Sequence, residues 1–373
     1  MLKKANVRGL HGKYDYDIDF NNDLTLFTGH NGSGKTSLLK LVWCMISPNR
    51  GALLRELRFE YARVETDRYI LELTPRYKSP VAPYTAQFLL TTLPTNENID
   101  ARKFMVLYDD DSYVRDGGER IEELNEILRP LEDRTLFFPT YRRIEGGFNS
   151  ADEKMLLSRY RMPRYRAAIA DVLDDFSESL SYPSHTFVTS ISTKDVASRL
   201  ADFKNKIDAK TNSKYLAFSK EVEDLISSSS DNGDHLAVIK RKLDSLKVER
   251  DKLSSPLTRL SDFVRDVFKD GGIKVSRFLT IGNSNSAVES EFLSAGEKQM
   301  FSFLSYNATL RNAIVFIDEP ELSLHVDWQR TLFDNLLSQE STNQFIATTH
   351  SPFIYSRYPD KEIMLSYDRG CSE

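Results

Sequence analysis

Residues 24–40 read Leu-Thr-Leu-Phe-Thr-Gly-His-Asn-Gly-Ser-Gly-Lys-Thr-Ser-Leu-Leu-Lys, and this stretch decides the fold. Its first five residues are apolar or β-branched, which predicts a buried strand, and its last residues predict a helix. The glycine-rich loop between them can turn backbone N–H groups toward phosphate oxygens, with Lys35 as a cation and Thr36 as a ligand for Mg²⁺. We therefore expect a nucleotide site formed by Asn31, Gly32, Ser33, Gly34, Lys35, Thr36 and Ser37.

A second apolar run carries two acids at its end. Residues 313–317 are all apolar, which suits a strand buried on both faces, and Asp318 and Glu319 follow directly. Ligands bind at the carboxyl edge of a parallel sheet, so Asp318 is expected to hold Mg²⁺ and Glu319 to deprotonate an attacking water. An isolated Asp-Glu pair is more often a solvated strand end, but the loop upstream favours the catalytic interpretation.

A capping motif precedes that strand. Ser294 and Glu297 have the S-x-x-E spacing of a capping box that opens a helix. The start of such a helix attracts anions, and Gly296 lets the backbone approach a phosphate closely. The spacing alone does not separate this interpretation from an ordinary capped helix.

Residues 293–299, Leu-Ser-Ala-Gly-Glu-Lys-Gln, resemble the signature motif of ABC ATPases. The resemblance implies that two copies close head to tail over two ATP molecules, each acting on the γ phosphate held by the other copy. The residues that it places in trans are Ser294, Ala295, Gly296 and Glu297. It also implies a switch role for His350, which follows a predicted strand at residues 344–349, and a D-loop at Ser323, Leu324 and His325, although His325 could equally be a surface residue.

The spacing of these motifs predicts insertions. Lys35 and Ser294 lie much farther apart than in transporter subunits. Residues 52–115 alternate apolar and polar positions, which predicts an antiparallel β subdomain. Apolar steps of three and four between residues 215 and 260 predict a helical hairpin or short coiled coil, with Pro256 interrupting the run; two ordinary helices packed on the head are the alternative.

The expected fold is therefore α/β: an ABC-type P-loop ATPase head with an antiparallel β subdomain and a helical insertion. Residues 1–150 are expected to form the first part of the head, 151–270 the insertion and 271–373 the second part. Gln87 lies in an alternating run and is expected to be structural, so no magnesium-sensing glutamine is assigned.

A head split in this way resembles the group of SMC proteins, Rad50, RecF and the overcoming-lysogeny ATPases. No Cys-x-x-Cys lies in the hairpin, which disfavours Rad50 itself. The residues from Asp318 to Glu321, followed by Leu324 and His325, look most like small ATPases of bacterial antiphage systems of the Septu or retron type. That resemblance implies a regulatory ATPase with a separately encoded effector: a nuclease, a toxin or a reverse transcriptase with its RNA.

Three alternatives stay open from the motifs alone. These are a RecF-like or SMC-like ATPase of DNA repair or maintenance, a transporter subunit, and a scaffold that binds ATP without turning it over. The long insertion disfavours the transporter, and intact Glu319 and His350 disfavour the scaffold.

Composition limits the partners. The net charge is -5, so contact with DNA or RNA would require a local patch. Arg142 and Arg143 could meet a phosphate or a partner carboxylate, although a solvated loop is favoured, as it is for the arginines between residues 159 and 166. Two cysteines, Cys44 and Cys371, are too few for a disulfide framework. With no apolar run long enough for a membrane span, a cytoplasmic protein is expected.

Overall fold

The computed structural model describes residues 1–77, 85–93, 100–107, 121–140, 143–144, 177–191, 193–227, 233–267, 294–339 and 342–365. A six-stranded parallel sheet of order β10-β8-β12-β13-β3-β14 lies at its centre. The strands are β3 (Leu24–Thr28), β8 (Arg134–Phe138), β10 (His185–Phe187), β12 (Ala313–Asp318), β13 (Gln344–Thr348) and β14 (Glu362–Met364). Every residue of β3, β12 and β13 is buried, as expected for strands covered on both faces. The predicted α/β fold with a parallel core is confirmed.

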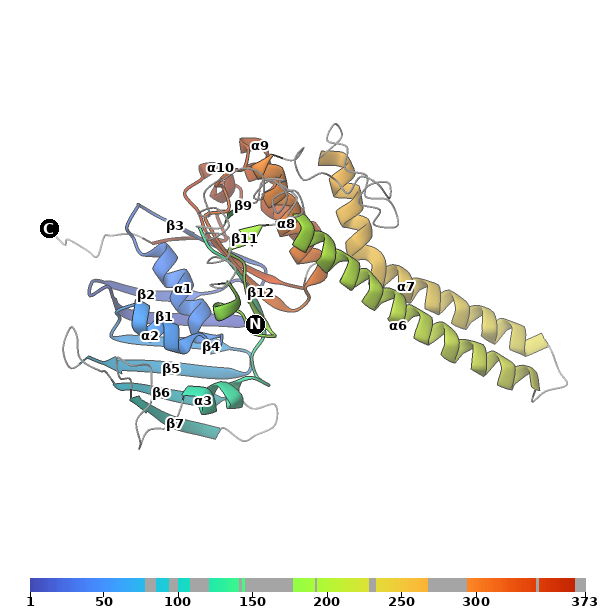
Figure 1. Ribbon diagram of the computed structural model, residues 1–373, viewed down its shortest axis with the longest axis horizontal. Helices are drawn as coiled ribbons and strands as arrows, with labels where there is room; N and C mark the ends of the chain where they lie inside the picture. Colours follow the sequence, from blue (N-terminus) through green and yellow to red (C-terminus); the bar gives the residue numbers. More distant parts are fainter. Residues whose placement is uncertain are drawn as a thin grey trace, which may run out of the picture.

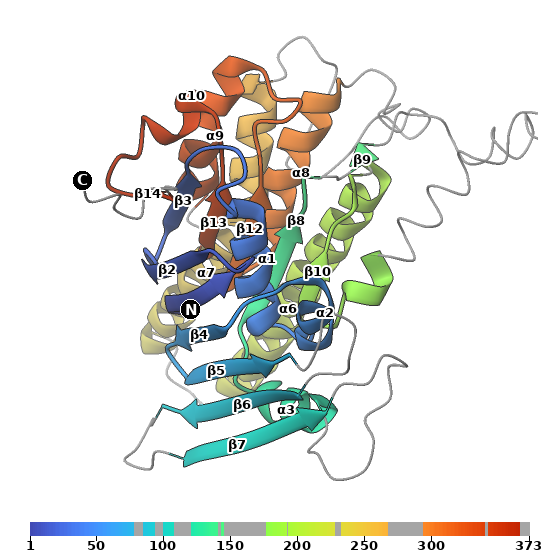
Figure 2. The ribbon, with the colours of Figure 1, turned by 90° about the vertical axis from the view of Figure 1, so that its left-hand side faces the viewer.

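An antiparallel sheet of order β2-β1-β4-β5-β6-β7 forms a second layer (Figure 2). Its strands are β1 (Leu2–Leu10), β2 (Tyr14–Asp19), β4 (Tyr61–Thr66), β5 (Tyr69–Arg76), β6 (Thr85–Thr92) and β7 (Asp100–Leu107). Buried residues alternate with more exposed ones along β4 and β5, because one face lies on the core. The predicted β subdomain is present, and β1 and β2 also belong to its sheet, which the sequence did not predict.

Helix α1 (Lys35–Met45) is packed between the two sheets. Leu38, Leu41 and Trp43 are fully buried and share one apolar cluster with Phe88 of β6 and Phe316 of β12. Burial of each large apolar side chain contributes roughly 1.5–3 kcal/mol. This packing fixes the helix that begins directly after the phosphate-binding loop.

Helices α8 (Ala295–Thr309) and α9 (Val326–Ser338) cover the opposite face of the parallel sheet. Met300 and Phe303 of α8 and Phe333 of α9 pack there with Val315 and Phe345. A short helix, α10 (Pro352–Tyr355), follows β13. This packing fixes α8 on the sheet whose strand ends carry Asp318 and Thr348.

Helices α6 (Thr193–Ser227) and α7 (Gly233–Val267) form a hairpin that projects from the head (Figure 1). Lys214 pairs with Glu249 and Lys242 with Glu221 across the hairpin. The predicted seam residues with described side chains are buried or half-buried: Tyr215, Phe218, Val222, Ile239, Leu243, Leu246, Leu253, Leu257 and Leu260. The predicted hairpin is present, but α7 continues through Pro256, the residue expected to interrupt the run.

The head also uses residues from the range predicted as insertion. Strand β10 pairs in parallel with β8, and β11 (Ser190–Ile191) pairs with β9 (Arg143–Ile144). Strands of two or three residues are too short to produce a recognisable apolar period. Residues 185–187 and 190–191 of the range predicted as insertion thus pair with strands β8 and β9, and the hairpin itself consists of α6 and α7.

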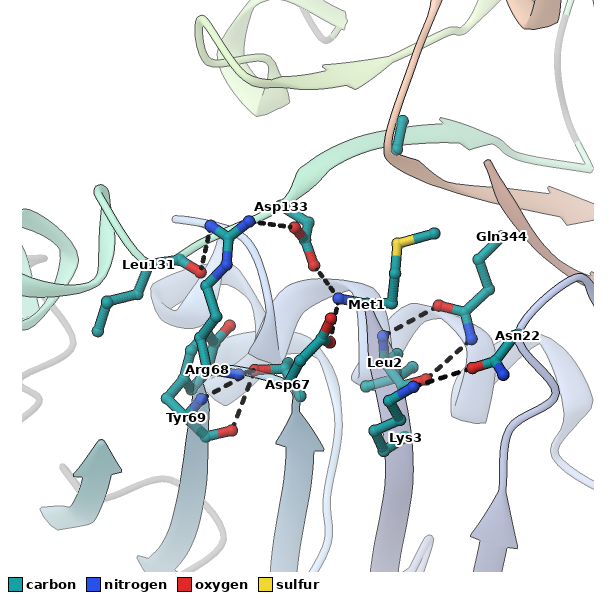
Figure 3. Close-up of polar contacts among 12 residues, drawn as sticks. Met1, Leu2, Lys3, Asn22, Asp67, Arg68, Tyr69, Leu131, Asp133 and Gln344 are labelled. Atoms are coloured by element: carbon teal, nitrogen blue, oxygen red, sulfur yellow. Dashed lines mark hydrogen bonds and ion pairs between the residues drawn. The ribbon is translucent and has the colours of Figure 1, made fainter. Parts of the chain in front are cut away.

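Contacts of the first residues join the two sheets. The amino group of Met1 lies between the carboxylates of Asp67 and Asp133 (Figure 3). The Gln344 side chain accepts from the N–H of Leu2 at 2.9 Å and donates to its carbonyl at 2.8 Å. These contacts fasten β1 to β13, the strand that leads to His350.

A buried ion pair links α2 (Arg50–Glu56) to the loop before β8. The Arg50 and Glu132 side chains are 0% and 2% exposed. The Nε2 atom of His185 lies 3.1 Å from the second oxygen of Glu132, and Arg50 donates to Asn125 at 2.5 Å. Burial alone would raise the pKa of Glu132, but the charge of Arg50 and the contact with His185 hold it below its ordinary value.

Glu132→Gln is expected to lower the free energy of unfolding by about 3–5 kcal/mol at neutral pH, because the buried guanidinium of Arg50 loses its counter-charge. The pKa of Glu132 is lower in the folded chain, so its stabilising contribution is present above the ordinary carboxyl value of 4.5. That contribution is lost as the pH falls through the folded-state value. The gap between variant and wild type should therefore shrink on acidification.

Urea unfolding at a series of pH values measures this gap. Glu126→Gln is the matched control, because Glu126 is exposed on α3 (Ile121–Leu128). Equal midpoints for the two variants at pH 7 would contradict the stabilising role of the ion pair.

Candidate nucleotide site

The phosphate-binding loop runs from the end of β3 into the first turn of α1. Gly34, directly before α1, has a φ of 81°, a left-handed conformation that favours glycine. Among the described residues, no side chain caps the N-terminus of α1. The first-turn N–H groups and the helix dipole can therefore act on an anion.

Lys35 lies within this loop and is only 6% exposed. Its Nζ atom donates to the carbonyls of Gly29 at 3.0 Å and His30 at 2.9 Å. Burial lowers the pKa of Lys35, and the nearby carboxylates of Glu319, Asp318 and Glu321 partly oppose that shift. The ammonium is thus held at the loop by neutral carbonyl oxygens, which negatively charged phosphate oxygens can replace.

Two tyrosines of β2 donate hydrogen bonds to the phosphate-binding loop. The Tyr14 hydroxyl donates to the Gly32 carbonyl at 2.5 Å, and the Tyr16 hydroxyl donates to the Ser33 carbonyl. On the outer side, Nε2 of His11 lies 2.8 Å from the hydroxyl of Ser37. The antiparallel sheet therefore helps to shape the loop.

The Asp318 carboxylate accepts hydrogen bonds from three threonine hydroxyls. It is 1% exposed and accepts the Thr36 hydroxyl at 3.0 Å and the Thr348 hydroxyl at 2.5 Å on one oxygen. Its other oxygen accepts the hydroxyl of Thr140, which follows β8. Three threonines, from the first turn of α1, the end of β13 and the segment after β8, thus surround one carboxylate, and the oxygens of Asp318 and Thr36 are hard donors suited to Mg²⁺.

Glu319 follows with a φ of 48°, a conformation that is uncommon outside glycine. Its N–H donates to the carbonyl of Thr348 at 3.2 Å and to the Thr348 hydroxyl at 3.1 Å, which fixes the turn. Burial raises the pKa of Glu319, as do the carboxylates of Asp318 and Glu321, while His350 and Lys35 oppose the shift. A half-buried carboxylate with a raised pKa is suited to accept a proton.

His350 lies at the end of β13 and is exposed. It lines a cavity of about 230 Å³ together with Gly29, His30 and Tyr355. The cavity joins the first residues of the phosphate-binding loop to the strand end that carries His350. His350 therefore lies beside Gly29 and His30 of the loop within one protomer.

The predicted capping box at α8 is formed. The Glu297 N–H donates to the Ser294 hydroxyl at 3.3 Å, and the Ser294 N–H donates to the Glu297 carboxylate at 2.6 Å. Ser294 and Ala295 are exposed, so this helix start faces solvent. Gly296 is buried where a Cβ would collide with the carbonyl oxygen of Ser323.

The predicted D-loop residues lie between β12 and α9. Ser323 is exposed with a φ of 68°, and Leu324 is 6% exposed. His325 is exposed and caps α9, with its Nδ1 accepting the N–H of Asp327 at 3.4 Å. Within one protomer, His325 is therefore the N-cap of α9.

Several predicted contacts cannot be placed at the site. Arg142 and the arginines at 159, 161, 164 and 166 lie outside the described residues, and so does Cys371. Arg143 begins β9, and its side chain lies outside the described part. Gln87 lies in the middle of β6 in the antiparallel sheet, in agreement with a structural role.

Sequence reasoning missed four groups that shape the site. The roles of Thr140 and Thr348 depend on strand order, which brings the ends of β8, β12 and β13 together. The alternation of Tyr14, Asp15 and Tyr16 could have placed both tyrosines on one face. Nothing in the local sequence identifies the phosphate-binding loop as their partner.

The fold and the site define a P-loop protein, in which a phosphate-binding loop and an Asp-Glu pair meet at the carboxyl edge of a parallel sheet. The chain belongs to the AAA ATPase domain family, whose model matches residues 1–355. A relative is the "Retron Vc95 probable ATPase" of Vibrio cholerae serotype O1 biovar El Tor, 30% identical over 123 residues. The match covers 28% of this chain and 23% of that relative, so it spans less than a quarter of the relative's length. It agrees with the predicted resemblance to retron-type ATPases.

Solved structures with a similar outline include Smc head domains. The head from Pyrococcus furiosus with an extended coiled coil, bound to the C-terminal domain of ScpA, is 14% identical with a TM-score of 0.34, covering 95% of this chain and 91% of that one. The head from Pyrococcus yayanosii with a coiled coil and joint is 13% identical with a TM-score of 0.38, covering 95% and 93%. None of the helices that the structure describes is both long and apolar enough to cross a membrane.

Proposed function

We propose that the chain binds ATP with Mg²⁺ and hydrolyses it, and that two copies close head to tail over the nucleotides. One observation carries this proposal. The hydroxyl of Thr36, beside the phosphate-binding loop, donates to the carboxylate of buried Asp318 at 3.0 Å. Membership of an ATPase family supports the same activity.

The residues present fit a magnesium ion. Thr36 and Asp318 would hold it, and the Thr140 and Thr348 hydroxyls would orient the carboxylate. When bound, Mg²⁺ neutralises charge on the phosphate oxygens. Lys35 would exchange its two carbonyl partners for phosphate oxygens, and the α1 dipole would add to the attraction.

Glu319 is the proposed base, with His350 as the group that orients the water at the γ phosphate. The raised pKa of Glu319 supports this role, as does the place of His350 on a cavity beside the loop. The exposed start of α8, with its intact capping box, supports a contact with nucleotide held by the other copy. Gly296, Glu297 and the D-loop would complete that contact.

We further propose that the ATPase is the regulatory subunit of a prokaryotic antiphage complex in the cytoplasm, controlling a separately encoded nuclease, toxin or reverse transcriptase. The retron relative supports this role. The test is purification of the Glu319→Gln protein with ATP from its native host, followed by mass spectrometry and nucleic-acid sequencing. An effector or a reverse transcriptase with RNA is expected. Recovery on DNA alone would favour repair or maintenance, and recovery with permeases would favour transport.

Thr140→Val is expected to raise the Mg²⁺ concentration for half-maximal turnover by about tenfold, because a hydrogen bond to a charged group is worth about 1.5–3 kcal/mol. The hydroxyl of Thr140 orients the Asp318 carboxylate, and valine keeps the shape. A Mg²⁺ titration of ATP turnover measures the change. Thr331→Val on the exposed face of α9 is the control, and indistinguishable titrations for the two variants would exclude a role for Thr140.

A further inference from the structure

The Glu321 carboxylate bridges two loops next to His350. One oxygen accepts the backbone N–H of His350 at 2.6 Å, and the other accepts the Thr349 hydroxyl at 3.0 Å. Thr349 and His350 thus both donate hydrogen bonds to one half-buried side chain. Glu321 itself lies just after the Asp-Glu pair of β12.

Gln329 of α9 forms a second bridge on the other side of His350. Its amide donates to the Leu324 carbonyl at 2.9 Å, and its oxygen accepts the Ser351 hydroxyl at 2.6 Å. The segment from Thr349 to Ser351 is therefore fastened twice to the loop of residues 319–325. A shift of that loop must move the backbone that carries the His350 imidazole.

The start of α8 rests on the same loop. The Gln299 side chain donates to the Pro320 carbonyl at 2.8 Å, and Gly296 packs against the Ser323 carbonyl without room for a Cβ. The exposed N-terminus of α8 and the backbone of His350 are thus joined through a few fixed contacts. A ligand that engages α8 would act on the geometry of His350.

We propose that Glu321 is a positioning residue that holds His350 for ATP hydrolysis and links it to the loop on which α8 rests. The inference rests on the proposed ATPase function and deepens it. Its basis is the geometry of the two bridges, and the charge of Glu321 is secondary to its two accepted hydrogen bonds. A glutamine at this position could still accept the His350 N–H and could donate to the Thr349 hydroxyl, whereas alanine would lose both contacts.

Glu321→Ala is expected to lower kcat by about 10–100-fold, since small misplacements of a catalytic group have effects of this size. KM for ATP should stay within about twofold, because the nucleotide contacts themselves are unchanged. Glu321→Gln should restore kcat to within about threefold of wild type, because the amide preserves the bridge. A glutamine variant as slow as the alanine variant would overturn the geometric role.

A double-mutant cycle with His350→Ala tests whether Glu321 acts through His350. If it does, adding Glu321→Ala to the His350→Ala protein should change kcat by less than about twofold. An equal loss in both backgrounds would overturn the proposal. If the Glu321→Ala protein does not fold, Gln329→Leu, which removes the second bridge, is combined with His350→Ala instead. A change in kcat of less than about twofold in the His350→Ala protein would support the proposal, and an equal loss in both backgrounds would overturn it.

Assays of the wild-type protein distinguish a failure of the positioning role from a failure of the proposed ATPase function. Wild-type turnover together with unchanged kcat in Glu321→Ala would refute the positioning role and leave the ATPase function intact. A wild-type protein that neither hydrolyses ATP nor dimerises with it would overturn both.

Discussion

Glu319→Gln is expected to lower ATP turnover by at least about 100-fold while leaving ATP binding intact, because the amide keeps the shape of the side chain but cannot accept a proton from water. Glu319 lies directly after Asp318, and its backbone is fixed in a left-handed turn by two hydrogen bonds to Thr348. The substitution therefore should not disturb the loop or the Asp318 cluster. Burial raises the pKa of Glu319, and a base must be unprotonated to act. The wild-type rate should therefore rise with pH, with the midpoint of the rise above the ordinary carboxyl value of 4.5.

The same variant should accumulate as a dimer when ATP and Mg²⁺ are present. Turnover assays give the rate, and analytical ultracentrifugation with and without ATP gives the assembly state. Glu126→Gln is the control, because Glu126 is exposed on α3 and does not belong to the strand ends that form the site. Normal turnover in Glu319→Gln would remove Glu319 as the base.

Ser294→Arg is expected to abolish ATP-dependent dimerisation while the monomer still binds ATP. Ser294 is exposed at the start of α8, so an arginine there adds bulk and charge to the surface that is proposed to meet the other copy. Loss of the cap would cost only about 1 kcal/mol, too little to unfold the head.

Ultracentrifugation and a nucleotide-binding assay separate the two effects of Ser294→Arg. Ser245→Arg places the same side chain on the exposed face of α7 and should dimerise normally. If Ser294→Arg dimerises with ATP as the wild type does, α8 does not contact nucleotide in trans.

Local sequence was sufficient for the elements that carry their own signal. The run from Leu24 to Thr36 predicted β3, the loop and α1, because the strand, the glycines and the helix are contiguous. The capping box at Ser294 and Glu297 was predicted from a spacing of three residues and is formed in the structure. The hairpin was predicted from its apolar period.

Contacts between distant segments could not be predicted in this way. Thr140 is far in sequence from Asp318, and it meets the carboxylate only because β8 pairs with β12. Glu321 was visible as part of a motif, but its two hydrogen bonds depend on the position of β13 beside β12. Strand β10 was missed because three residues show no period, although pairing with β8 places it in the central sheet.

The most direct test of the central claim mixes two inactive variants, Lys35→Ala and Ser294→Arg. In a head-to-tail dimer, one copy of each forms a single complete site from the intact Lys35 of one chain and the intact Ser294 of the other. A mixed dimer carries the Ser294 substitution at only one of its two interfaces, so mixing should restore turnover to at most about a quarter of the wild-type value, although each variant alone is inactive. No recovery at any mixing ratio, with both variants folded and Ser294→Arg still binding ATP, would contradict a site shared between two copies.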